Sequence, residues 1–404
     1  MRSHMMIVLC LGILFTATTA RAISGAGAIA LQFNTSVRAE GMGGAGIAVP
    51  WGGDVNNWAN PALLAFRPGV RYDRMESQLV PDLADEIFIH SNQVTVGAYG
   101  VGLLFAQGPM DGVFLDMGNQ ISTNDDGTQG PTFDSWMKAQ YHGIGVNLTH
   151  VIAALNNEQI PDILQRLDVS GGIVWKEFED MLAPDYVLQD AQGGSSTARC
   201  HDLGLLASYR FIDSRGHGDG ALSFLGGLML AASAGISTLN TGGDFIVHVD
   251  ADQADPLPKM HVKGWAVHAE TGFPAKWESW DHSWLAEALT PLFSVTYSRQ
   301  RIQPGITWVE ADHDYVYGLD DDEVETGWGY EIGIANVLHV RRGHLHGTGQ
   351  IDGKTRGWGL HIPFGRYGGL RYDKATVPQA TGLCDVTRES AGFWIDVYAL
   401  LNQE

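Results

Sequence analysis

The chain has 404 residues, enough for two or three soluble domains, and its 46 acidic and 25 basic residues give a formal net charge of −21. No nucleic-acid partner is expected, because binding duplex or single-stranded nucleic acid needs a basic surface. The 51 glycines and 12 tryptophans are unusual for soluble domains, whereas an acid excess is also common as a plain source of solubility.

The first residues have the pattern of an export signal. Arg2 and His4 form a basic start, an apolar run extends from Met5 to Phe15, and small residues end at Ala22. This order predicts a secretory signal peptide over residues 1–22, because the apolar run is shorter than the ~20 residues that a spanning helix needs. No later window of about twenty residues lacks charges and turn formers, so no transmembrane helix is expected after it.

A glycine-rich stretch follows, Gly41-Met42-Gly43-Gly44-Ala45-Gly46, which satisfies the GxGxxG pattern of dinucleotide-binding sites. That motif needs a hydrophobic strand before it, a helix after it and an acidic residue about twenty positions further on. The segment from Gln32 to Arg38 is polar, and Pro50 and Gly52 would stop a helix within a turn. We therefore do not predict a nucleotide site.

The same stretch belongs to a longer ordered pattern. Arg38-Ala39-Glu40-Gly41-Met42-Gly43-Gly44-Ala45 is followed by Asp54 and then by Asn60-Pro61-Ala62. Residues 38–65 resemble the N-terminal signature of the FadL superfamily of outer-membrane proteins, especially its PorV-like branch. Leu63 departs from this signature, in which a glycine usually follows Asn-Pro-Ala.

This resemblance implies an all-β fold, a transmembrane antiparallel β-barrel of about fourteen strands, with residues 23–65 in or across the lumen as a plug. It also implies that Gly41, Gly43, Gly44, Gly46, Asn60, Pro61 and Ala62 belong to that plug. Glycines would let the backbone pass a crowded wall, and Asn60 before Pro61 would fix an extended bend.

Several later segments alternate apolar with small or polar residues at a period of two. They are Tyr141–Thr149, Asp202–Phe211, Gly227–Ser237, Gly264–Glu270, Phe293–Ser298 and Trp328–Ile334. Barrel strands in a membrane must alternate in this way, because one face meets lipid and the other meets the lumen. We predict that these segments are strands whose polar face carries ionisable groups.

Alternation alone does not separate a barrel from a soluble β-sandwich. Aromatic residues recur near the segment ends, as in the girdles at the two membrane interfaces, although ordinary core packing also places aromatics there. These residues are Tyr99, Phe105, Tyr141, Trp175, Tyr209, Phe211, Trp265, Tyr297, Trp328, Tyr330, Trp358, Tyr372 and Trp394. Together with the signal peptide and the resemblance, they favour the barrel.

The connections are unequal in length. Ile212–Gly220 is predicted as a short polar turn, and the long Asp- and Gly-rich excursions are Gly108–Lys138, Asp180–Arg199 and Leu239–Lys259. Short turns on one rim and long loops on the other are typical of outer-membrane barrels. Val151–Leu167, interrupted by Pro161, and Ala275–Leu289 have helical spacing; they are either rim helices or amphipathic helices at the bilayer surface or a ligand entrance.

A second match to the same family lies near the C-terminus. It begins at Tyr330-Glu331-Ile332-Gly333 and continues through Leu338–His344 and Gly357–Leu360 to Gly369–Pro378, similar to the closing strands of PorV-like proteins. The last strand is predicted over Ala391–Leu400. It lacks the usual terminal aromatic residue, and 401–404 extend past it.

The remaining clusters of histidine, acidic residues and cysteine do not indicate a metal site. Alternation would spread His339, His344, His346 and His361 over a turn and opposite faces, so no metal site is predicted. Asn124-Asp125-Asp126-Gly127 lacks the first acid and the closing glutamate of a calcium loop. The acidic run Asp320–Glu325 is either a solvated surface or a site of divalent-ion bridging to lipopolysaccharide. Pairing of Cys200 with Cys384 stays open.

We therefore expect a signal peptide (1–22), a plug segment (23–65) and a transmembrane β-barrel with long extracellular loops (66–404), in the outer membrane of a Gram-negative-type bacterium. There is no GxSxG, HExxH or P-loop motif, and we predict no catalytic residue, no cofactor and no enzymatic activity. An outer-membrane hydrolase stays open as an alternative, because such barrels place Ser, His and acid on different strands, where sequence spacing gives no signal. Expected partners are outer-membrane lipid, lipopolysaccharide and the barrel assembly machinery.

Two functions compete under this resemblance. The FadL branch implies passive uptake of hydrophobic small molecules such as long-chain fatty acids or hydrocarbons, and the PorV-like branch implies partnership with secretion-system proteins in protein secretion or surface attachment. A soluble all-β carbohydrate-binding or adhesion protein is a third possibility. An apolar track beside the plug would favour uptake, whereas a polar, filled lumen with a groove on the extracellular rim would favour secretion.

Overall fold

The computed structural model describes residues 27–81, 84–123, 126–155, 161–184, 194–214, 227–242, 246, 254–272, 289–305, 307–308, 315–316, 324–347, 351–365, 367–379 and 383–397. The predicted signal peptide therefore lies outside the described residues, and so do most of Ala275–Leu289 and parts of the Asn124 and Asp320 clusters. None of the described helices is long and apolar enough to cross a bilayer.

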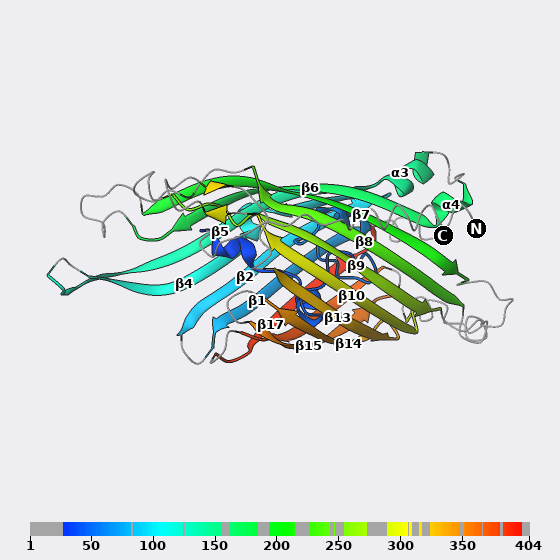
Figure 1. Cartoon of the computed structure of the whole chain (residues 1–404). Coiled ribbons are helices and arrows are strands. Elements are labelled where there is room, and N and C mark those ends of the chain that lie inside the picture. Colours follow the sequence, from blue (N-terminus) through cyan, green and yellow to red (C-terminus); the bar gives the residue numbers. More distant parts are fainter. Residues whose placement is uncertain are drawn as a thin grey trace.

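The strands form one antiparallel sheet that closes on itself (Figure 1). In chain order they are β1 (Gly69–Val80), β2 (Ala84–Ala98), β3 (Val101–Ala106), β4 (Gly112–Thr123), β5 (Gln129–Asn147), β6 (Leu167–Met181), β7 (Ser195–Asp213), β8 (Leu228–Thr241), β9 (Met260–Thr271), β10 (Phe293–Pro304), β13 (Glu325–Ile334), β14 (Leu338–His346), β15 (Asp352–Pro363), β16 (Gly368–Val377) and β17 (Val386–Ile395). A short pair, β11 (Thr307–Trp308) and β12 (Tyr315–Val316), lies between β10 and β13.

Closure comes from β1, which pairs with β17 on one side and with β2 on the other. β3 and β4 share one place in the wall, because both pair with β2 and both pair with β5. The wall therefore has fourteen strand positions, which confirms the predicted fold. Apart from the outer part of the β4–β5 hairpin, each strand position of the described wall is paired on both sides, as a strand protein in lipid requires.

Side chains alternate across this wall. In β7, Leu203 and Leu205 are exposed, whereas Asp202, which precedes them, and Gly204, which lies between them, are buried. The six segments predicted as strands lie in β5, β7, β8, β9, β10 and β13, with ionisable groups inside, as expected; the first of them ends at Asn147, where a helix begins.

The outer face carries apolar residues on every side of the barrel. They include Val96, Leu103, Phe105, Val169, Trp175, Leu203, Leu205, Leu230, Trp265, Val267, Val295, Trp328, Ile332, Val340, Trp358, Leu360, Leu370 and Phe393. The predicted aromatic positions are outward for Phe105, Trp175, Trp265, Trp328 and Trp358. The prediction is wrong for Tyr141, because alternation along β5 places it on the inward face together with Gly143 and Gly145. Tyr209 is buried and packs against Phe211.

One rim, called here the short-turn rim, holds both ends of the barrel chain and the tight connections 99–100, 335–337 and 364–367. It also holds the longer connections 148–166, 214–227 and 272–292, so the prediction that long connections gather on one rim is only partly right. Connection 148–166 contains α3 (Leu148–Leu155) and α4 (Asp162–Gln165), in agreement with the helix predicted over Val151–Leu167 and its break at Pro161.

The opposite rim, called here the long-loop rim, carries the predicted excursions as connections 182–194 and 242–259. Gly108–Lys138 is not a loop, because most of it forms β4 and β5. Beyond Asp116 these two strands pair only with each other, and Figure 1 shows their hairpin projecting past the wall. Similarly, Ile212–Gly220 is split between the end of β7 and connection 214–227, and the last strand is Val386–Ile395 rather than Ala391–Leu400.

Residues 27–67, called here the N-terminal segment, lie inside the barrel and contain η1 (Ile29–Gln32), α2 (Val37–Gly41) and η2 (Pro61–Phe66). Residues 36–50 and 54–65 are buried throughout. Figure 1 shows this blue segment enclosed by the strands.

Candidate functional site

The glycines singled out in the sequence form the turn that follows α2. Ser36 caps this helix, its hydroxyl accepting a hydrogen bond from the Ala39 amide at 3.2 Å. Gly43 has a φ of +70° and touches the wall so closely that an added Cβ would lie 2.7 Å from the Trp328 carbonyl oxygen. Its amide donates to the Thr355 hydroxyl at 2.9 Å. The segment can approach the wall this closely only with glycine at this position.

The other predicted glycines have different surroundings. Gly41 lies beside Arg341, and its carbonyl oxygen accepts a hydrogen bond from Thr355 at 3.1 Å. Gly44 has a φ of +77°, but an added Cβ would meet only the side chain of Leu345, at 4.0 Å. Gly46 packs on Ala39, and its amide donates to the side chain of Gln300 at 3.2 Å. All four glycines therefore lie in the N-terminal segment, against β10 and β13–β15 or next to them.

Asn60-Pro61-Ala62 fixes the other end of the segment to the wall. The Asn60 side-chain amide donates to the carbonyl oxygens of Ile47 at 3.0 Å and Leu205 at 3.2 Å, and its oxygen accepts from the Ala62 amide at 3.1 Å. Pro61 begins η2 in the first turn, where a missing amide hydrogen has no cost. Asn60 thus joins the glycine turn, η2 and β7.

A buried ion network ties the segment to one side of the barrel. Arg38 binds Glu331 of β13 through two hydrogen bonds, of 3.0 Å from Nε and 2.6 Å from Nη2. Glu331 also accepts from Arg341 of β14 at 2.6 Å, and Arg341 reaches Asp373 of β16 at 2.5 Å. These four side chains are almost completely buried. The two stretches that carry the family resemblance therefore meet in space.

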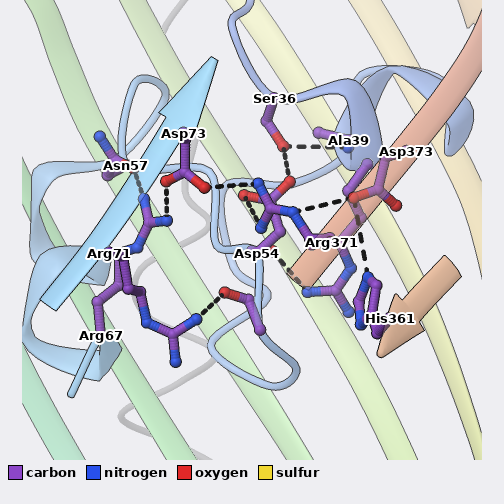
Figure 2. A network of polar contacts seen from close by, with 12 residues as sticks. Ser36, Ala39, Asp54, Asn57, Arg67, Arg71, Asp73, His361, Arg371 and Asp373 are labelled. Carbon is purple, nitrogen blue, oxygen red and sulfur yellow. Dashed lines mark hydrogen bonds and ion pairs between the residues drawn. The ribbon is translucent and has the colours of Figure 1, made fainter. Parts of the chain in front are cut away.

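The network continues through Arg371 of β16, as Figure 2 shows. Arg371 lies 3.2 Å from Asp54 of the N-terminal segment, 2.8 Å from Asp73 of β1 and 3.1 Å from Asp373. Arg67 pairs with Asp73 and donates to the side chain of Asn57 at 2.8 Å. Each carboxylate faces at least one guanidinium group, which offsets the cost of burying the charges.

We call the inner faces of β13–β17 and β1 the ionic half of the lumen. Arg388 of β17 adds to it, lying 3.3 Å from Glu40 of α2. Burial raises the pKa of the Glu40 carboxyl above its ordinary value, and the nearby charge of Arg388 partly opposes this rise.

The inner faces of β2–β7 carry more apolar side chains than the ionic half does, and we call them the apolar half. A hydrophobic cluster lies on these faces among buried polar residues, and it contains Ile89, Leu104, Ala106, Val113, Leu115, Met137, Ala139, Tyr141, Val174, Phe178, Ala198 and Cys200. Ala30 and Leu31 of η1 and Trp58 pack against this cluster from the N-terminal segment. Polar groups are also buried here, among them Asp168 and Asp180 of β6. The buried pair Lys176–Asp202 lies at 2.7 Å, and its ammonium is 3.9 Å from the centre of the Trp58 ring.

The ladder of the wall is interrupted by one position beside the apolar half, where only Gln93 of β2 and Gln140 of β5 have no partner on β3 or β4. Residues 107–111 leave the ladder between β3 and β4 as an outward bulge containing η3 (Gly108–Met110). Asp111 lies 3.3 Å from Lys138 and Gln107 lies 2.9 Å from His142, both on the outer face. Inside, the bulge is flanked by Ala106, Val113, Ala139 and Tyr141, which all belong to the apolar cluster.

A cavity of about 730 Å³ opens at the short-turn rim on the same side of the barrel. It lies between η2, the β2–β3 turn and α3, and its walls are mostly apolar, with Pro50, Phe66 and Ala153 among them. His150 is a polar member, lying 3.0 Å from Asp168 of β6.

The histidines separate into two groups. His339 and His361 meet inside the ionic half, with ring centres 4.2 Å apart, whereas His344 and His346 lie near Asp352. Within the part of the chain that the structure describes, no three potential ligands form a metal-binding group. Cys200 is buried and Cys384 is exposed, and no disulfide joins them.

No protein-family model matches the sequence, and a comparison with curated proteins finds no significant match. Among solved structures, the chain is similar to the toluene transporter TbuX of Ralstonia pickettii, with 11% identity, a TM-score of 0.41 and coverage of 90% of this chain and 98% of that one. It is also similar to the toluene transporter TodX of Pseudomonas putida, with 11% identity, a TM-score of 0.40 and coverage of 94% and 100%. A FadL homologue of Pseudomonas aeruginosa has 8% identity, a TM-score of 0.40 and coverage of 94% and 100%.

Proposed function

We propose that this protein is an outer-membrane channel for the passive uptake of hydrophobic small molecules, such as long-chain fatty acids or hydrocarbons. The observation that carries the proposal is the apolar half of the lumen, which faces η1 and lies beside the interruption of the wall. A water-filled pore for polar solutes would instead need a polar lining along its whole length.

The outer surface supports placement in a bilayer. Apolar side chains alternate outward on strands all around the closed wall, and closure satisfies the backbone hydrogen bonds within the sheet. We place the short-turn rim in the periplasm and the long-loop rim outside the cell, following the usual pattern of short periplasmic turns. Residues 27–65 then act as the plug, with 66–404 as the barrel.

Different parts of the plug would have different roles. The ionic half anchors α2 and the residues around Asp54, because moving them would separate buried charges. By contrast, η1 contacts the wall mainly through apolar packing, and Ile29 is about half exposed. We therefore assign η1 as the movable part, whose displacement opens a path along the apolar half toward the interruption at 107–111.

The apolar half favours uptake over the alternative role as a PorV-like secretion partner, which predicts a lumen that is polar throughout. In this proposal the chain binds and releases its solute without catalysis. The driving force is the concentration gradient of the solute, and an apolar path spares the solute contact with water, so no other energy source is required.

The test is uptake by liposomes that contain the purified barrel. Fatty-acid and monoaromatic hydrocarbon uptake should be faster with the intact mature chain than with empty liposomes, and faster still for a variant lacking Ile23–Leu31. Ala139→Trp, which fills the inner side of the interruption, should slow uptake. Ile332→Trp, on the outer face of β13, is the matched control, and equal uptake by all proteins and empty liposomes would refute the channel.

A further inference from the structure

Basic side chains gather on the outer face of the wall over strands β9 to β16. The outward positions of these strands hold Lys263, Arg299, Arg301, Arg342, Lys354, Arg356 and Lys374. Among the described residues of these strands, the only outward carboxylate is Asp352, which lies 3.4 Å from His344. Such a band of positive charge is unexpected in a chain with a formal net charge of −21.

Arg342 and Arg356 are at the centre of this band. They are direct partners across the β14–β15 ladder, an arrangement of like charges that destabilises a sheet unless an anion lies between them. Both are exposed, and neither forms an ion pair or side-chain hydrogen bond with another described residue. Lys374 differs, because it lies 2.7 Å from Glu389 of β17.

The surface around the two arginines is amphiphilic. A shallow groove of about 330 Å³ is lined by Arg342, Arg356 and Lys374 together with Val340 and Trp358. Toward the short-turn rim, the outward residues of the same strands are apolar, as Leu338 of β14 and Leu360 and Ile362 of β15 show. A ligand with a negatively charged head and hydrocarbon chains would therefore match the surface in one orientation, with its head toward the long-loop rim.

We infer that Arg342 and Arg356 bind a phosphate group of a phosphorylated glycolipid, the lipid A part of lipopolysaccharide, in the outer leaflet. The inference rests on the proposed placement in the outer membrane. Each planar guanidinium group can donate paired hydrogen bonds to phosphate oxygens, which a lysine cannot do in the same geometry. The remaining cations of the band suit a head group with more than one phosphate, while the acyl chains lie along Val340, Trp358 and Leu360.

Binding can be measured in detergent micelles by native mass spectrometry, with purified lipid A as the probe. We expect the double variant R342Q/R356Q to bind lipid A at least about tenfold more weakly than the unmodified chain. Enzymatically dephosphorylated lipid A should bind the unmodified chain as weakly as lipid A binds this variant. The matched control is R166Q/R199Q, which removes the same charge from exposed arginines elsewhere and should retain the affinity.

The outcomes are distinct. Equal affinity of R342Q/R356Q and the unmodified chain for lipid A would overturn the inference, and so would an equal loss in R166Q/R199Q. The inference would also be overturned if phosphatidylglycerol bound the unmodified chain as tightly as lipid A does and R342Q/R356Q weakened that binding. The site would then be assigned to a phospholipid. Each variant should run as the folded barrel on a denaturing gel when the sample is not heated. This control separates loss of binding from misfolding. This experiment measures lipid binding and not transport. A negative result would therefore not contradict the uptake proposal, which the liposome experiment tests.

Discussion

At the scale of single residues, Arg38 joins α2 both to the wall and to a later part of the N-terminal segment. Besides its two hydrogen bonds to Glu331, its Nη1 donates to the carbonyl oxygens of Trp51 at 2.6 Å and Asp54 at 2.7 Å. Arg38→Ala would leave a buried carboxylate short of one partner and two carbonyl oxygens without a donor. We expect the free energy of unfolding, measured by urea titration in lipid vesicles, to fall by about 3–5 kcal/mol.

Arg74→Ala provides the matched comparison. Arg74 lies 3.2 Å from Glu76 on the outer face of β1, and both side chains are more than half exposed. Since water screens such a pair, its removal should change the free energy of unfolding by no more than about 1 kcal/mol. Similar losses in the two variants would show that the buried network does not anchor the segment.

The glycine turn offers a second test at this scale, because Gly43 and Gly44 share a positive φ and differ in their surroundings. Gly44→Ala would bring no close contact and should cost only backbone strain, about 1–2 kcal/mol. Gly43→Ala adds a collision with the carbonyl oxygens of Trp328 and His344, so its cost should exceed that of Gly44→Ala by roughly 1–3 kcal/mol. Equal losses of unfolding free energy in Gly43→Ala and Gly44→Ala would mean that the strands shift and make room for the added methyl group at Gly43.

At the scale of elements, inward glycines of the wall lie where η2 touches the strands. An added Cβ on Gly172 of β6 would lie 2.8 Å from the Ala62 amide nitrogen and closer still to Pro61. Gly171→Ala is the matched control, because its Cβ would point outward and come no closer than 3.4 Å to Leu205 and 3.8 Å to the Gly204 carbonyl oxygen. We expect Gly172→Ala to cost about 1–3 kcal/mol and to expose residues 27–67 to added protease, and Gly171→Ala to do neither.

The strands themselves were largely predictable from the sequence, because an inner face and an outer face impose a period of two. The β4–β5 hairpin escaped prediction, since its composition is rich in Asp and Gly and its outer part lies beyond the wall, where no apolar face is needed. The break between β3 and β4 was also missed. Its signal was Gly108-Pro109 followed by Gly112, a pair of turn formers inside an alternating run.

The candidate site was predictable only in part. The sequence placed Arg38 and Glu331 in two stretches of family resemblance, but their pairing depends on the closure of the barrel across 293 positions. The same limit applies to Arg371 and Asp54, whose pairing no local pattern encodes. Alternation does predict that Glu331, Arg341 and Asp373 face inward, and an inward carboxylate next to an inward arginine on the adjacent strand indicates a buried ion pair.

At the scale of the whole molecule, the lumen is divided into an ionic half that binds α2 and the residues around Asp54, and an apolar half that faces η1, the part that we propose to be movable. This division separates two requirements that conflict in a simple pore. Under the proposed uptake function, the barrel would have to stay closed to water and ions and also admit apolar molecules. In this proposal, anchoring by buried charges meets the first requirement, and the packing of η1 through apolar contacts without a buried charge meets the second.

The division predicts the electrical behaviour of the channel in planar bilayers. The intact chain should conduct no measurable ionic current, and the variant lacking Ile23–Leu31 should not either, because residues 36–65 still fill the lumen and remain paired with the ionic half. The double variant R38A/R371A removes that pairing and should open to ions. A steady water-filled conductance of the intact chain would contradict the division, because ions would then cross a lumen in which residues 36–50 and 54–65 are buried.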